Sequence, residues 1–192
     1  MKAFFQKYSY TVIKLFVNQI AIALFGIGLA VALGKAGNRT GQLVASILSV
    51  LFYLFLLYVH MWEVGAKDGI TAEARKTGRG LWRGFAIGAV ANALNILMAL
   101  LILPGAFADG AVKGFSSTVS VIALMVEGMY IGILATPLNG LSLNAYAWPY
   151  FVIVLPAILV AGVAYILGSY NLHATNILIP KNKDVKNNGR PE

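Results

Sequence analysis

The chain has 192 residues, of which 59% are apolar and 11% charged, and it contains no cysteine. A soluble domain cannot bury so much apolar surface, and the lack of cysteine excludes disulfides, thiolate metal sites and cysteine nucleophiles. The net charge of +8 does not indicate nucleic-acid binding, because the basic residues flank apolar runs, where they would meet anionic lipid headgroups.

About five apolar runs match the thickness of a bilayer's hydrocarbon core, which takes roughly 18 residues or more of helix. They cover residues 11–34, 42–65, 84–103, 117–136 and 148–170. The sequence therefore predicts an all-α, polytopic membrane helix bundle. We expect a single transmembrane domain over 1–180 and a basic, disordered tail over 181–192.

The first run follows Lys2 and Lys7, and Lys14 in its first turn can extend to the headgroups. Ala30 to Ala32 resembles a signal-peptide cleavage site, but the run is long for a signal peptide and four more runs follow. We expect a retained helix. The second run ends in Tyr58, His60, Trp62 and Glu63, and aromatic residues there indicate the membrane interface.

The most polar internal stretch, 66–83, follows the second run. Its basic residues predict a cytoplasmic loop, with the N-terminus on the same side and anionic headgroups as partners from Lys67 to Arg83. The third run stops at Pro104. The fourth, 117–136, is the least apolar and carries Glu127 near its centre, whereas Pro156 predicts a kink in the fifth.

The side on which the chain ends depends on the fourth run. Five full crossings, which we expect, would place the basic tail outside the cell. If 117–136 is instead a re-entrant or interfacial helix, four spans remain and the tail returns to the cytoplasm, in line with its charge. Four spans plus one non-spanning helix is the alternative.

Small residues recur at four-residue spacing, which permits close backbone approach between helices in lipid. The predicted packing positions are Gly26, Ala30, Gly34, Gly84, Gly88, Gly128, Gly132, Ala157 and Ala161. Their recurrence predicts a compact bundle, or a homo-oligomer that uses one such row as its contact.

Polar residues within apolar runs are the candidates for function, because each must be paired, neutral or in contact with water. A predicted ligand or ion path comprises Glu127, His60, Glu63, Asn92, Asn95, Asn18 and Gln19. Structural roles are the alternative: Glu63 can be solvated or paired with Lys67, His60 can be hydrogen-bonded, and the amides can join helices.

No pattern for catalysis or cofactor binding is present in the sequence. His60 and Glu63 reverse the Glu-x-x-His order of di-iron bundles and have no second copy, so we expect no metal and no cofactor. Motifs of intramembrane proteases and phosphate-binding loops are also missing. With no nucleophile and base to assign, an enzyme acting on lipid is the least favoured hypothesis.

Four segments resemble a group of multi-pass membrane proteins of clostridial Gram-positive bacteria, to which no activity is assigned. They are Trp62 to Asp68, Gly84 to Asn95, Glu127 to Tyr130 and Pro156 to Ile158. The resemblance implies a bacterial plasma membrane and carries no function. We expect a small transporter, channel or transport-system subunit for a small solute or cation; the alternative is a non-catalytic scaffold that binds a partner protein or anionic lipid.

Overall fold

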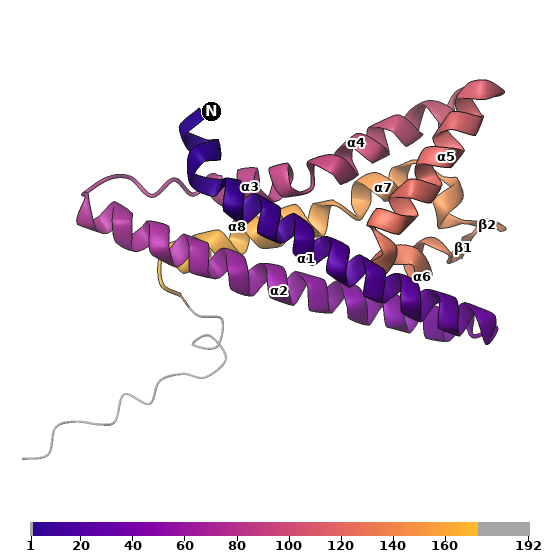
Figure 1. Cartoon of the computed structure of the whole chain (residues 1–192), viewed down its shortest axis with the longest axis horizontal. Helices are drawn as coiled ribbons and strands as arrows, with labels where there is room; N and C mark the ends of the chain where they lie inside the picture. The colour runs from indigo at the N-terminus through magenta and orange to yellow at the C-terminus, as the bar shows by residue number, and fades with distance from the viewer. Residues whose placement is uncertain (1, 173–192) are drawn as a thin grey trace, which may run out of the picture.

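The computed structural model describes residues 2–172, so the predicted tail over 181–192 lies outside the described residues. Two long helices, α1 (Lys2–Lys35) and α2 (Arg39–Ala74), lie antiparallel along the length of the molecule (Figure 1). The remaining chain folds back on them as α3 (Arg83–Ala91), α4 (Ala93–Ile102), α5 (Ala111–Val126), α6 (Ile131–Leu134), α7 (Trp148–Val152) and α8 (Leu155–Ser169). The predicted helix bundle is confirmed.

Short elements join these helices. Three 3-10 turns, η1 (Leu103–Ala106), η2 (Gly128–Tyr130) and η3 (Leu143–Ala145), follow α4, α5 and the hairpin respectively. The hairpin consists of β1 (Pro137–Leu138) and β2 (Leu141–Ser142), which pair antiparallel through a turn at Asn139 and Gly140. Both turn residues have positive φ, the conformation that a tight two-residue turn requires.

Three helices are long and apolar enough to cross a membrane, and up to five segments are if each bent pair counts as one span. α1, α2 and the stretch from α7 to α8 are the three; the bent pairs are α3 with α4 and α5 with α6. α1 and α2 expose many large apolar side chains along their lengths, as lipid-facing helices must.

The helix boundaries differ from the predicted spans where a helix continues beyond its apolar run or is interrupted within it. α2 continues to Ala74, nine residues beyond the expected end at 65, so the predicted loop over 66–83 is helical in its first half. Hydropathy marks the part of a helix that lies in lipid, and it does not mark where helical hydrogen bonding stops. In the fifth run, the helix is interrupted between Val152 and Leu155, where Pro156 predicted a kink.

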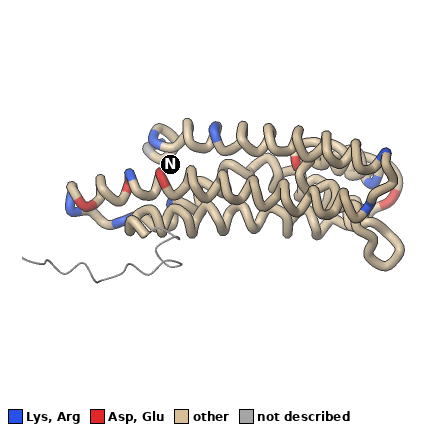
Figure 2. Tube along the Cα trace, turned by 90° about the horizontal axis from the view of Figure 1, so that it is seen from below, with Lys and Arg blue, Asp and Glu red and all other residues tan. Residues whose placement is uncertain are grey.

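The molecule has two ends, named here for the chain's N-terminus and for the β1–β2 hairpin. The N-terminal end comprises residues 2–8, 66–83 and 165–172, and the hairpin end comprises 35–39, 103–111 and 135–146. Charged residues gather at these ends, and the stretch between them is nearly free of charge (Figure 2). The basic residues are more numerous at the N-terminal end, which holds Lys2, Lys7, Lys67, Arg75, Lys76, Arg79 and Arg83.

The α5–α6 segment leaves the hairpin end and returns to it. α5 starts beside η1, α6 turns by 94° at Glu127, and β1 and β2 follow at the end from which α5 departed (Figure 1). Gly132 in α6 lies against the backbone of Gln42, near the start of α2. A pair of helices bent in this way is either a broken span or a re-entrant segment, so five crossings and the four-span alternative both stay predictions.

Candidate functional site in the core of the bundle

Two bent helix pairs break at polar residues halfway along the bundle. Asn92 ends α3 and starts α4, with a bend of 58° between them, and Glu127 ends α5 and starts η2. The Asn92 side chain donates to the Gly88 carbonyl at 2.9 Å, so it takes up an acceptor within its own helix. The break at Glu127 is followed by Gly128, where a side chain would collide with the Ala23 carbonyl of α1.

Glu127 is buried, with 2% of its surface exposed, and its Oε2 atom has no hydrogen-bond partner. No ion pair to it exists among residues 2–172. Three phenols surround it within electrostatic range: Tyr53 of α2, Tyr130 of η2 and Tyr150 of α7. A buried carboxyl without a counter-charge is costly, and it must therefore hold a proton or gain a cation.

The asparagine pair extends this cluster toward α4. Asn95 Nδ2 donates to Asn92 Oδ1 at 3.1 Å, both residues are buried, and Asn92 neighbours the Tyr53 side chain. Asn95 Oδ1 and the hydroxyls of Tyr130 and Tyr150 are buried without partners. Unpaired polar atoms are rare in protein cores, and two of these, the Tyr130 and Tyr150 hydroxyls, belong to side chains within electrostatic range of Glu127.

The structure brings together some predicted site residues and separates others. Glu127, Asn92 and Asn95 belong to the cluster, and buried Gln19 lies one turn of α1 from Ala23, which faces Gly128. Others do not join it: His60 is half-buried near the charges of Lys14, Glu63 and Lys67, Glu63 is exposed, and Asn18 is half-buried.

Most of the predicted packing positions lie at close contacts between elements, and Gly84 and Gly88 contact another predicted position, Ala161. Gly26 of α1 lies against the backbone of Met129, and Ala30 accepts a hydrogen bond from Gln42 at 2.7 Å. Gly84 and Gly88 of α3 pack on Ala161 of α8. Of the other positions, Gly128 lies against α1 and Gly132 against α2. Ala157 is buried in α8, whereas Gly34 is exposed beside the end of the Gln42 side chain.

The tyrosines of the core and a second polar cluster, at the N-terminal end, are not predicted from the sequence. There, Asp68 forms an ion pair with Lys7 at 2.6 Å and accepts hydrogen bonds from Tyr8 and from Tyr165, the latter at 2.7 Å. Tyrosine is common in membrane helices near the membrane interface, so a tyrosine in an apolar run is only a weak sequence signal for a functional site. Asp68 lay in the segment predicted as a loop.

The described residues hold no group of three or more His, Cys, Asp or Glu side chains suited to a metal ion. The class that the fold and the core cluster define is a helical protein whose helices are long and apolar enough to cross a membrane, with two interrupted helix pairs and, within residues 2–172, one buried acid, Glu127. Comparison of the chain with protein-family models, curated proteins and solved structures finds no match. The resemblance to clostridial membrane proteins stays a prediction.

Proposed function

We propose that this chain is a small carrier or channel that conducts protons or a small monovalent cation, with Glu127 as the binding group. The observation that carries the proposal is the buried Glu127 carboxyl, which has no counter-charge and lies at a sharp break between helices. In membrane transporters, interrupted helices near the bilayer midplane typically supply the site for a substrate or coupling ion.

The chemistry of the cluster supports a monovalent ligand. A single carboxyl has the neutral phenols of Tyr53, Tyr130 and Tyr150 within electrostatic range, and the amide pair of Asn92 and Asn95 neighbours Tyr53. Divalent cations in proteins are usually held by several oxygen ligands with more than one negative charge. One carboxyl balances one positive charge, which a proton, Na⁺ or K⁺ supplies.

We further propose a bacterial plasma membrane as the location, with the N-terminal end in the cytoplasm. The excess of Lys and Arg at that end supports this orientation, since cytoplasmic segments carry more basic residues. The residues from Lys67 to Arg83 would then face anionic headgroups. In this arrangement α1, α2, α3 with α4, and α7 with α8 cross the bilayer, while α5 with α6 enters and leaves on the outer side.

Proton and cation flux tests the proposal directly. Purified protein is reconstituted into liposomes that contain a pH-sensitive dye, and flux is driven by a K⁺ diffusion potential or by gradients of Na⁺ or K⁺. We expect the wild type to conduct one of these ions and Glu127→Gln to lower the rate at least tenfold, because the amide cannot take up a positive charge.

Glu63→Gln is the matched control, because Glu63 is exposed and lies outside the cluster. Its flux should stay within twofold of the wild type. A Glu127→Gln variant that conducts as well as the wild type contradicts the proposal. A wild type that moves none of the three ions also contradicts it and favours the scaffold hypothesis.

A further inference from the structure

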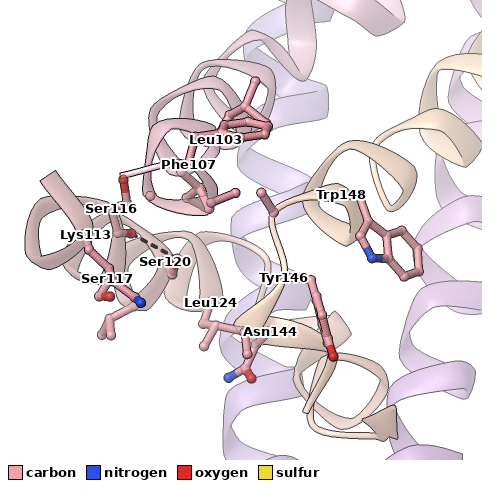
Figure 3. A pocket seen from close by; sticks show the side chains of 16 residues that line it. Leu103, Phe107, Lys113, Ser116, Ser117, Ser120, Leu124, Asn144, Tyr146 and Trp148 are labelled. Atoms are coloured by element: carbon pink, nitrogen blue, oxygen red, sulfur yellow. Dashed lines mark hydrogen bonds between the residues drawn. The ribbon is translucent and has the colours of Figure 1, made fainter. Parts of the chain in front are cut away.

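A groove opens at the hairpin end between η1 and α5 on one side and η3 and α7 on the other (Figure 3). Its volume is about 660 Å³, enough for a small hydrated solute. Phe107 and Leu103 come from the α4–α5 connection, and Asn144, Tyr146 and Trp148 come from the segment that precedes and starts α7. Figure 3 shows these side chains around the opening.

One face of α5 forms the long wall of this groove. Lys113 lies at the start of α5, followed by Ser116, Ser117 and Ser120 at helical spacing, and Leu124 is the last lining residue on the helix. Ser116 donates to the Leu101 carbonyl at 3.2 Å, and Ser120 donates to the Ser116 carbonyl at 3.0 Å. The wall is thus polar along α5 and becomes apolar at its inner limit.

The inner limit of the groove lies close to the buried carboxyl. Leu124 precedes Glu127 by three residues, which is about 4.5 Å along the axis of a helix. Tyr150, which is 1% exposed, neighbours both Ser120 at the groove and Glu127 in the core, and its hydroxyl lacks a hydrogen-bond partner. Tyr150 therefore links a residue of the groove wall to the acid.

We infer that this groove is the access path by which water and monovalent cations pass from the hairpin end to Glu127, and that Tyr150 closes its inner limit. The inference rests on the proposed function, since it assigns the route to the proposed site. A second groove of about 580 Å³ at the same end has Arg39 in its wall. The basic residue in the wall of the first groove, Lys113, is paired with Asp109 at 3.2 Å.

The opposite end of the bundle is closed by contacts. Asp68 joins α1, α2 and α8 there, and the Phe4 and Trp82 rings stack with their centroids 6.2 Å apart. The backbones of α2 and α8 touch at Gly65 and Gly69. These contacts hold α1, α2, α8 and the α2–α3 connection together at the N-terminal end, and we therefore infer entry from the hairpin end.

Reaction of single cysteines with a charged thiol reagent tests the path, and the chain's lack of cysteine removes any background. We compare Leu124→Cys with Met125→Cys in lipid nanodiscs, using a cationic methanethiosulfonate. The two residues are at the same depth, but Met125 is 63% exposed on a face outside the groove, where lipid would cover it. We expect Leu124→Cys to react at least tenfold faster.

The role of Tyr150 is tested in a Glu127→Cys background. Replacing the ring with a small side chain, Tyr150→Ala, should raise the labelling rate of that cysteine at least tenfold, whereas Tyr150→Phe keeps the ring and should change it less than twofold. Equal rates for the Ala and Phe variants overturn the assignment of Tyr150.

These outcomes separate the path from the proposed function. If Leu124→Cys reacts no faster than Met125→Cys, the access path is wrong, whatever the flux of the Glu127→Gln variant shows. If Leu124→Cys reacts fast but Glu127→Gln conducts normally, the groove is a water-filled entry and Glu127 is not the group it serves, so the inferred route to that carboxyl also fails.

Discussion

Asp68 connects three helices through one carboxylate. Lys7 and Tyr8 of α1 and Tyr165 of α8 all bind this residue of α2. The side chain of Asp68 is 10% exposed and that of Lys7 is 47% exposed, so water screens the ion pair from one side. The hydroxyl hydrogen bonds, which are made to a charged acceptor, contribute the larger share of the stabilisation.

Replacing Asp68 with alanine should therefore destabilise the protein. We expect Asp68→Ala to lower the free energy of unfolding by about 1–3 kcal/mol, because the buried hydroxyl of Tyr165 loses its acceptor. Unfolding by SDS titration in mixed micelles measures the effect. Asp109→Ala is the control, since the Asp109–Lys113 pair is exposed, and its loss should leave stability unchanged. Equal stability of the two variants would contradict this assignment.

At the residue scale, the sequence indicates which polar groups need an explanation and not which ones meet. Hydrocarbon disfavours Glu127, Asn92 and Asn95; all three are buried, and Tyr53 neighbours both Asn92 and Glu127. His60 met the same criterion but lies nearer the charged end. Whether two polar side chains meet depends on their depth along the bundle and on the direction in which each helix presents them. A bend of 58° or 94° changes both without altering the apolar pattern of the sequence.

Close backbone contact between α2 and α8 is the main feature at the scale of the elements. A Cβ atom at Gly65 would come within 3 Å of the Tyr165 backbone, and one at Gly168 would do the same at Trp62. The four-residue spacing of small residues predicted close contacts for other helices. Which helix packs against each row of small residues depends on the topology, which the spacing does not give. Gly65 and Gly69 were not included because they lay at the margin of the second run.

The Gly65→Ala variant should lower the free energy of unfolding by about 2 kcal/mol or more, because neither backbone can move without separating the helices. Gly28→Ala is the matched control: Gly28 is also helical, and nothing lies within 4 Å of its Cβ position. That variant should be neutral or more stable by up to about 1 kcal/mol, since alanine favours helix. If Gly65→Ala unfolds like the control, α2 and α8 are not in contact.

At the scale of the whole molecule, the return of α5 and α6 to the hairpin end favours four crossings of a membrane over five. The apolar run over 117–136 is long enough to cross, and hydropathy alone favoured five crossings. The bend at Glu127 shortens the reach of this segment, and β1 and β2 then lie at the end from which α5 departs. A break inside a helix is a property that composition does not reveal.

Labelling of single cysteines by an impermeant reagent tests this topology in sealed vesicles. Asp109 and Leu141 flank the α5–α6 segment and are both exposed. We expect Asp109→Cys and Leu141→Cys to react from the same side, and Thr77→Cys, at the N-terminal end, to react only from the other. Five full crossings would instead place Asp109 and Leu141 on opposite sides.

The length of α2 has a mechanical consequence for the bilayer. Between Arg39 and Glu63 the helix has no charged residue, and these 23 residues extend about 35 Å, whereas the hydrocarbon core is about 30 Å thick. A tilt of roughly 30° accommodates the difference and lies within the range seen for membrane helices. In thicker membranes α2 would tilt less, so the angle between α2 and the membrane normal would depend on the chain length of the lipids.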